Sequence, residues 1–301
     1  MPQSDITTLT YNVTGNREDL LDLVVNVDAK ETPIWSRLAK VKATSTNHEW
    51  QQDSLATPST AGYVEGVSAT FAAASARTRL GNYTQIFRRT VTVSDTQRAM
   101  NPAGIGDEYE YQLQKQIVNL ARDIEITLIR GGGSASSSGA SAGARLLRGM
   151  NSWISSNTGG PAAANSALAE SEFTTLLEAI YNNSGNPNMV FVTSRMKRDI
   201  SGFSGGASKQ IAIGEDDVKL NAAVDVYMSD FGLVGIILDR WCLPDTGLVL
   251  EVDKWRVAML RPIEYKNIAY LGGSTDGKVE AELTLEALHE KTAGRLVNVS
   301  S

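Results

Sequence analysis

The chain has 301 residues, 42% of them hydrophobic and 21% charged, and this balance excludes a globally disordered protein. Its 28 basic and 34 acidic residues give a net charge of −6, which argues against a protein that grips DNA phosphates through a basic face. No run approaches the ~18 apolar residues of a membrane span, and we expect neither a membrane contact nor a secretory signal. The single Cys242 cannot form an internal disulfide, which suits a reducing cytoplasm.

Residues 1–31 are polar and acidic, and they predict an N-terminal arm. Within the arm, Arg17 to Val27 has helical periodicity. Its apolar residues fall on one helical face, namely Leu20, Leu21, Val24 and Val27. An amphipathic segment of this kind could pack on its own domain or on a neighbouring subunit, and the sequence leaves both open.

Two predicted strands flank an unusually long connection. The first runs from Asn47 to Asp53, and its expected mate runs from Asn82 to Asp95. The mate alternates apolar and polar residues and is rich in β-branched side chains. The connection from Ser54 to Gly81 consists mostly of Ala, Ser, Thr and Gly. Connections of this length are uncommon inside a compact domain, so we interpret this one as a projecting arm whose tip packs on another subunit.

The strongest predicted helix runs from Asp107 to Arg130, with Asp107 and Glu110 placed as in a capping box. Gly131 to Gly133 ends it. At 1.5 Å per residue the helix would be ~36 Å long. Its apolar residues recur three or four positions apart, at Tyr109, Leu113, Ile117, Leu120, Ile124 and Leu128.

A second α/β region follows a Ser/Ala/Gly tract, residues 134–144, that we expect to be a flexible loop. Its predicted elements are a helix through Phe173 and Ile180, a strand Met189 to Val192, a helix that Ser194 caps and that runs to Ile200, and a hairpin of Val224 to Met228 with Leu233 to Leu238. Later strands are expected at Gly247 to Leu260 and Lys278 to Leu288, with a tail at Leu296 to Val299. We predict that residues 32–150 and 246–301 share one sheet under the long helix, and that residues 151–245 form a separate lobe.

The two histidines give weak metal-site signals. His48-Glu49 begins like a zincin motif, but Gln52 stands where the second histidine would be. Asp53 could add a third metal ligand, but Trp50 would then lie between the ligands on the strand. His289 lies beside Glu290 and carries no stronger signal. We therefore predict no metal site.

One weak hydrolase pattern is present, because residues 202–206 match G-x-S-x-G around Ser204. The motif needs a strand before the serine and a helix after it, and neither is predicted here. A triad would also require His289 as the base, with Asp225 or Asp239 to orient it. Asp230-Phe231-Gly232 spells a kinase triplet but fits a hairpin turn better. The sequence therefore predicts no catalytic residue, no cofactor and no enzyme activity.

Local residues resemble the major capsid proteins of tailed bacteriophages, which have the Johnson fold. The resemblance covers roughly residues 30–150, and the remainder agrees in layout only. It rests on six short stretches, Thr32-Pro33-Ile34-Trp35, His48-Glu49-Trp50-Gln51-Gln52-Asp53, Glu65-Gly66, Asn82-Tyr83-Thr84-Gln85-Ile86-Phe87, Arg122-Asp123-Ile124-Glu125 and Arg145-Leu146-Leu147-Arg148-Gly149-Met150.

The resemblance implies an α+β chain with an N-arm at 1–31 and a peripheral domain at 32–150. That domain would hold an E-loop hairpin (about 47–95) and a spine helix (about 107–130). The axial domain would span 151–245, and residues 246–301 would return to the peripheral domain.

The implied function is self-assembly into the hexamers and pentamers of an icosahedral or prolate phage head that encloses double-stranded DNA. Scaffolding, portal and decoration proteins are further expected partners, and DNA would be contacted non-specifically if at all. The protein would be part of the virion and would be made and assembled in the cytoplasm of the bacterial host. An encapsulin-like compartment shell and a serine hydrolase stay open as alternatives.

Overall fold

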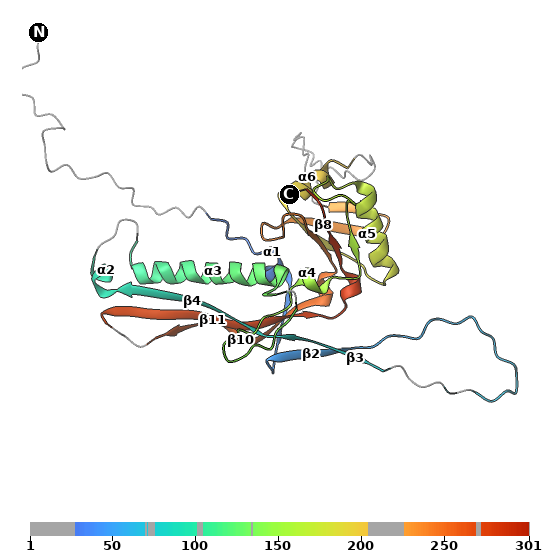
Figure 1. Cartoon of the computed structure of the whole chain (residues 1–301), viewed down its shortest axis with the longest axis horizontal. Coiled ribbons are helices and arrows are strands. Elements are labelled where there is room, and N and C mark those ends of the chain that lie inside the picture. Colours follow the sequence, from blue (N-terminus) through green and yellow to red (C-terminus); the bar gives the residue numbers. More distant parts are fainter. Residues whose placement is uncertain are drawn as a thin grey trace, which may run out of the picture.

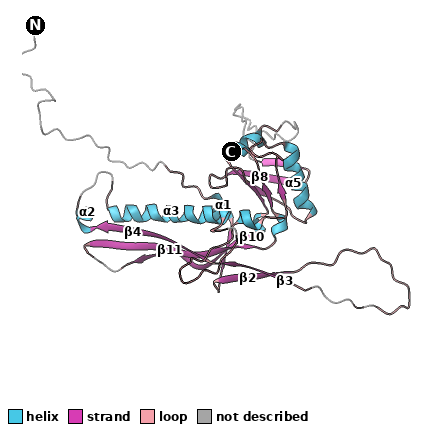
Figure 2. Cartoon of the chain, in the orientation of Figure 1, coloured by secondary structure: helices cyan, strands magenta, loops and turns pink. Residues whose placement is uncertain are grey.

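The computed structural model describes residues 28–69, 71, 76–100, 105–133, 135–203, 226–268 and 272–300. It is an α+β structure with a four-stranded sheet, a six-stranded sheet and a separate two-stranded ribbon (Figures 1 and 2). The predicted helix Arg17 to Val27 lies outside the described residues. In the part of the chain that is described, no helix has the length and apolar character needed to cross a membrane.

The four-stranded sheet combines strands from the N-terminal and C-terminal thirds of the chain. Its order is β1 (Ala39–Lys42), β10 (Trp255–Asn267), β11 (Ser274–Ala287) and β4 (Gln85–Ser94). β1 runs parallel to β10, and the other two pairs are antiparallel. The prediction that N-terminal and C-terminal strands share a sheet is therefore confirmed.

The long helix α3 (Glu108–Arg130) lies along this sheet, next to β4 and β11 (Figure 1). Asp107 caps it by accepting a hydrogen bond from the Tyr109 N–H at 2.9 Å, and Gly131 ends it at a φ of +83°. Its 23 residues span about 35 Å, as predicted. The inner face buries Leu120, Ile124, Leu128 and Ile129. Ile117, although part of the predicted apolar stripe, stays 41% exposed.

The projecting ribbon differs from the prediction. β2 (Asn47–Gln52) pairs with β3 (Thr78–Tyr83), and the chain then enters the four-stranded sheet as β4. The expected single strand Asn82 to Asp95 is therefore wrong, because the chain breaks at Thr84. The Thr84 N–H donates to Thr46 O at 2.8 Å, and its buried hydroxyl donates to Glu282 at 2.8 Å. We define the E-loop as β2, β3 and the connection between them.

The six-stranded sheet has the order β5-β12-β9-β6-β8-β7. The strands span Thr158–Gly159 (β5), Gly294–Leu296 (β12), Gly247–Leu250 (β9), Met189–Val192 (β6), Gly232–Leu238 (β8) and Val226–Ser229 (β7). The predicted strand Met189 to Val192 and the hairpin are confirmed for the residues that are described. β9 and β12 correct the expectation that every strand after residue 246 returns to the sheet of α3. The expected strand Gly247 to Leu260 is split by the 3-10 turn η2 (Val252–Lys254).

Helices α5 (Glu170–Asn182) and α6 (Ser194–Ser201) cover one face of the six-stranded sheet (Figure 2). Both helices were predicted, but the N-cap of α6 is Thr193 and not Ser194. The opposite face contributes Phe191 and Leu250 to the core that also holds α3 side chains. The two sheets therefore share one continuous hydrophobic core.

Shorter elements connect these layers. They are α1 (Pro33–Arg37), α2 (Asp95–Ala99), α4 (Met150–Trp153) and the 3-10 turn η3 (Glu290–Thr292). The tract expected to be a flexible loop folds back on itself, because Ser137 and Leu146 exchange two backbone hydrogen bonds of 2.9 and 3.1 Å.

Candidate functional site

The tip of the E-loop is the most exposed apolar part of the described chain. Its described residues between β2 and β3 form no helix or strand. Leu55, Tyr63 and Phe71 are 99%, 95% and 94% exposed, and Val64 and Val67 are also largely open. Figure 1 shows the loop extending away from both sheets. Large apolar side chains gathered on a projecting segment mark an interaction surface.

The base of the E-loop, by contrast, is fixed to the body. Trp50 is buried with its ring 5.6 Å from that of Trp153. The Asn82 side chain donates to the carbonyls of Arg148 and Leu285, at 3.0 and 2.8 Å, and accepts from the Arg148 N–H at 2.9 Å. The loop is therefore held at its root and free of the body at its tip.

A ladder of ion pairs lies on the four-stranded sheet. Glu280 and Glu282 of β11 are buried beneath the basic side chains that pair with them, namely Arg88, Arg145, Arg261 and Lys278. Hydrogen bonding from Lys278 lowers the pKa of Glu280, with Arg88 adding to the effect. Glu280 is thus held ionised, and both carboxylates are engaged by structural partners.

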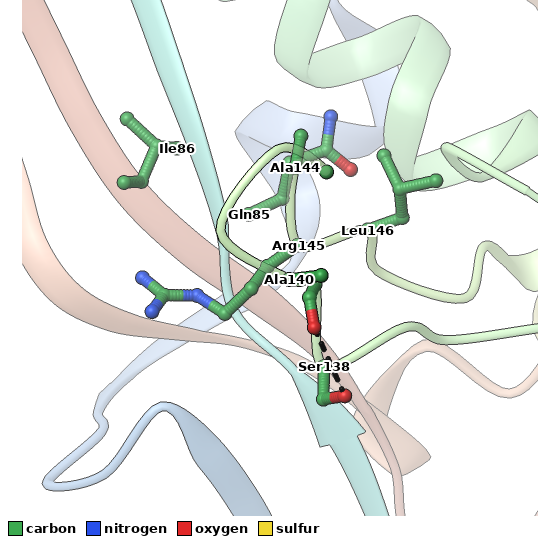
Figure 3. A pocket seen from close by; sticks show the side chains of 9 residues that line it. Gln85, Ile86, Ser138, Ala140, Ala144, Arg145 and Leu146 are labelled. Atoms are coloured by element: carbon green, nitrogen blue, oxygen red, sulfur yellow. Dashed lines mark hydrogen bonds between the residues drawn. The ribbon is translucent and has the colours of Figure 1, made fainter.

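Next to this ladder is a cavity of about 390 Å³ between β4 and the loop of residues 138–146. Figure 3 shows the lining residues, which include Gln85 and Ile86 of β4 and Ser138, Ala140 and Arg145 of the loop. Its main polar groups already have partners in the chain. Gln85 accepts a hydrogen bond from the Leu147 N–H at 3.1 Å, and Arg145 pairs with Glu282. The cavity offers no reactive group to a substrate.

A buried carboxyl pair lies at the junction of the two sheets. Glu125 of α3 is fully buried and accepts the backbone N–H groups of Ile34 and Trp35, at 2.7 and 2.6 Å. Asp239, which follows β8 and is 2% exposed, accepts the Trp241 N–H at 2.8 Å and interacts electrostatically with the Glu125 carboxyl group. The pair therefore joins α1, α3 and the segment after β8.

Burial raises the pKa of Glu125 to about 7, although its two backbone donors act in the opposite direction. Burial also raises the pKa of Asp239. Two carboxyl groups can share a hydrogen bond only if one keeps its proton. Among the described residues, no N–H or hydroxyl group donates to Asp239 Oδ2. We infer that the pair holds one proton between its two carboxyl groups.

The residues screened for metal chemistry lie apart and have structural partners. His48 Nε2 lies 3.5 Å from a Glu286 oxygen, Asp53 pairs with Arg77 at 3.5 Å, and Gln52 donates to the Leu288 carbonyl. Among the described residues, no group of three or more His, Cys, Asp or Glu side chains could hold a metal ion. Glu290, beside His289, accepts backbone hydrogen bonds from Ser155 and Ser156.

The hydrolase candidates are not brought together by the described structure. Ser204 and Asp225 lie outside the described residues, and Asp239 is engaged with Glu125. The Asp230-Phe231-Gly232 triplet lies at the β7–β8 turn, where Ser229 Oγ accepts the Phe231 N–H at 3.2 Å and donates to Gly232 O at 2.9 Å. The prediction of a hairpin turn is confirmed.

A comparison with known protein families identifies the family of this chain. Residues 6–300 match the family described as SU10 major capsid protein. The chain belongs to this family. It is therefore a major capsid protein, a structural component of a phage virion, as the sequence resemblance predicted.

Individual relatives agree. The major capsid protein of Escherichia phage Phieco32 is 31% identical over 124 residues, which are 41% of this chain and 35% of that protein. The matched part thus spans about a third of the relative's length. Among solved structures, the capsid of cyanophage A-1(L) superposes with a TM-score of 0.67 at 13% identity, over 97% of this chain and 99% of that one. Gordonia phage Cozz gives a TM-score of 0.64 at 12% identity, over 98% and 96%. These likenesses confirm the Johnson fold.

The same fold also occurs in a compartment shell. The SrpI encapsulin of Synechococcus elongatus superposes with a TM-score of 0.58 at 12% identity, over 92% of this chain and 93% of that one. At this identity the likeness concerns the fold alone. Family membership therefore decides between the two kinds of shell, in favour of the phage capsid.

Proposed function

We propose that this major capsid protein assembles with copies of itself into hexamers and pentamers, which close into an icosahedral or prolate head around double-stranded DNA. The observation that carries the proposal is the exposed E-loop tip. Tyr63 and Phe71 remain almost fully exposed on the subunit, which costs free energy unless another molecule covers them.

Within a shell, the E-loop would lie over a neighbouring subunit and the N-arm, residues 1–31, would run beneath another. A standard protein interface buries about 1,600 Å² in total. A subunit that extends two arms makes several such contacts at once. Each contact can then be weak alone while the closed shell is stable.

The division of the chain into parts is also a proposal. The four-stranded sheet, α3 and the E-loop would form the peripheral domain. The six-stranded sheet with α5 and α6 would form the axial domain, to which β9 and β12 return after residue 246. The shared core supports a nearly rigid connection between the two.

The acidic balance fits a shell wall that does not grip DNA. With a net charge of −6, contacts with the packaged genome would be few and non-specific. Scaffolding, portal and decoration proteins would be further partners, and assembly would take place in the cytoplasm of the bacterial host. We propose no enzymatic activity, since the candidate residues that are described have structural roles.

Replacing the E-loop tip with a short turn tests the proposal. A variant in which residues 54–77 are replaced by Asn-Gly should fold, because the described tip residues lie outside the core, but should not form closed particles in negative-stain microscopy. A control variant should carry a Gly/Ser segment in place of residues 134–144, which follow the C-terminal end of the long helix. Normal particles from the E-loop variant would overturn the proposed role of the tip.

The two alternatives have their own tests. A specific enzyme that co-purifies inside the particles would favour a compartment shell. A hydrolase would lose its activity in the Ser204→Ala variant, and an esterase rate that this variant leaves unchanged would end that idea.

A further inference from the structure

A second cleft, of about 250 Å³, lies where the root of the E-loop meets α4 and η3. It is lined by Gln52 and Leu80 from the E-loop, by Arg148, Trp153 and Ser155 around α4, and by His289, Glu290 and Lys291 around η3. We call it the Arg148 cleft. It is separate from the cavity of Figure 3, which lies beside β4 and residues 138–146.

Arg148 is an unusual arginine in this structure. Its guanidinium stacks on the Trp153 ring at 4.3 Å and donates to Ser152 O at 2.6 Å. Among the described residues, however, no carboxylate lies within ion-pair distance of it, and its Nε is buried without an acceptor. Arg88, Arg145 and Arg261 each pair with a glutamate. Burial lowers the pKa of Arg148, and the nearby charge of Glu290 only partly offsets this effect.

Other donors in the cleft also lack partners. Trp153 is 7% exposed, and its indole N–H has no acceptor in the described part of the chain. Lys291 is exposed and forms no ion pair with a described residue. The one carboxylate in the wall, Glu290, accepts hydrogen bonds from Ser155 and Ser156 through both oxygens. With Arg148 and Lys291 set against the single carboxylate Glu290, the wall of the cleft carries a surplus of positive charge that a further carboxylate would balance.

The tip of the E-loop carries one such group. Glu65 is the single carboxylate between Ser54 and Thr78. It is exposed, lies at a turn with Gly66 at a φ of +83°, and is flanked by the exposed Val64 and Val67. Arg77 and Arg79, at the end of the loop, already pair with Asp53 and Glu49. Glu65 is thus a carboxylate of the E-loop tip that forms no ion pair with a described residue.

We propose that the Arg148 cleft of one subunit receives the Glu65 carboxylate from the E-loop tip of a second copy. The inference rests on the proposed function, since it requires that copies pack through the E-loop. It adds a specific contact that fixes the register of the tip on its neighbour. The apolar residues beside Glu65 would cover the rim of the cleft, and the ion pair would be partly shielded from solvent.

A cysteine cross-link tests the contact directly. In assembled particles of the Glu65→Cys/Lys291→Cys variant, mild oxidation should link subunits into a covalent ladder on a denaturing gel. The native Cys242 is buried and should not take part. Each single variant, and a Glu65→Cys/Lys266→Cys control, should give no ladder. Particles that form normally but show no ladder beyond the controls would overturn the inference.

Charge reversal gives an independent measurement. Glu65→Lys and Lys291→Glu both change exposed side chains, so neither should disturb folding. Each alone should lower the particle yield at least tenfold, and the double variant should restore it. Normal yields from both single variants would contradict the contact. If the wild-type protein formed no particles at all, the proposed function would fail first, and that result differs from particles that assemble without the contact.

Discussion

The carboxyl group of Glu125 on the long helix lies against that of Asp239, in the segment that follows β8, and the two groups interact inside the core. The same Glu125 carboxyl receives the first backbone N–H groups of α1. Arg130 and Cys242 are the other ionisable groups that face the pair. Through these contacts the pair connects α1, α3 and the segment after β8 inside the core.

The pair makes stability depend on pH. Glu125 has a pKa of about 7 in the folded protein and an ordinary value of 4.5 when unfolded, so the folded state binds more protons between these values. Stability from this group should be fully present below about pH 4.5 and should be lost as the pH rises toward 7. The loss should be roughly 1–3 kcal/mol. Thermal melting of the wild type and of Glu125→Gln between pH 5 and pH 8 measures this loss. If the melting temperatures of the two proteins were the same across this range, the shared proton would be contradicted.

Asp239→Asn replaces the shared proton with a permanent donor. The new amide can donate to Glu125 at any pH, and its oxygen can still accept the Trp241 N–H. The variant should therefore melt at the same or a higher temperature than the wild type at pH 8 and should show a flatter pH dependence. A variant that loses stability equally at pH 5 and pH 8 would argue against a proton between the two groups.

Removing the Glu125 carboxyl altogether should be costly. In Glu125→Ala, the N–H groups of Ile34 and Trp35 lose their acceptor while remaining inside the protein. The expected loss is about 2–4 kcal/mol, from two unsatisfied donors together with a small cavity. Denaturant unfolding measures the change. A loss below ~1 kcal/mol would mean that the N–H groups find other acceptors.

Two apolar positions of α3 provide a matched pair. Leu128 is fully buried, and Ile117 is 41% exposed on the same helix. Leu128→Ala should cost about 2–5 kcal/mol, and Ile117→Ala should cost less than ~1 kcal/mol. Equal losses of stability in denaturant unfolding would show that α3 is rotated from the orientation described.

The tip of the E-loop should separate folding from assembly. Tyr63→Ser with Phe71→Ser changes two side chains that contact little of their own subunit, so the melting temperature of the isolated subunit should shift by less than about 2 °C. The yield of closed particles should fall strongly. Ile117→Ser, another exposed apolar change, is the control. If the double variant assembled as well as the control, the tip would not be an important interface.

Regular elements were predictable because their signals are local. The periodicity from Tyr109 to Leu128 and the glycines after Arg130 mark α3 without any tertiary information. The hairpin around Asp230 follows from turn chemistry in the same way. The long connection after Asp53 was recognisable as a projecting arm because most of its residues are small and such a length is uncommon inside a compact domain.

The errors share a physical cause, which is that sheet membership depends on distant partners. Tyr83 and Gln85 lie in one β-rich run, but the break at Thr84 arises from bonds to Thr46 and Glu282. β9 and β10 also read as one strand, although they belong to different sheets. The role of Glu125 was missed because an acidic residue beside Ile124 looks like the edge of a solvated face. The available signal was that Glu125 lies three residues before Leu128, which places both side chains on the buried face of the helix.

The most direct test of the capsid role is negative-stain microscopy, with light scattering, of the purified full-length protein across a range of concentrations, with and without a scaffolding protein. We predict closed shells of uniform diameter built from hexamers and pentamers. A stable monomer at high concentration, with no shells under either condition, would contradict that role.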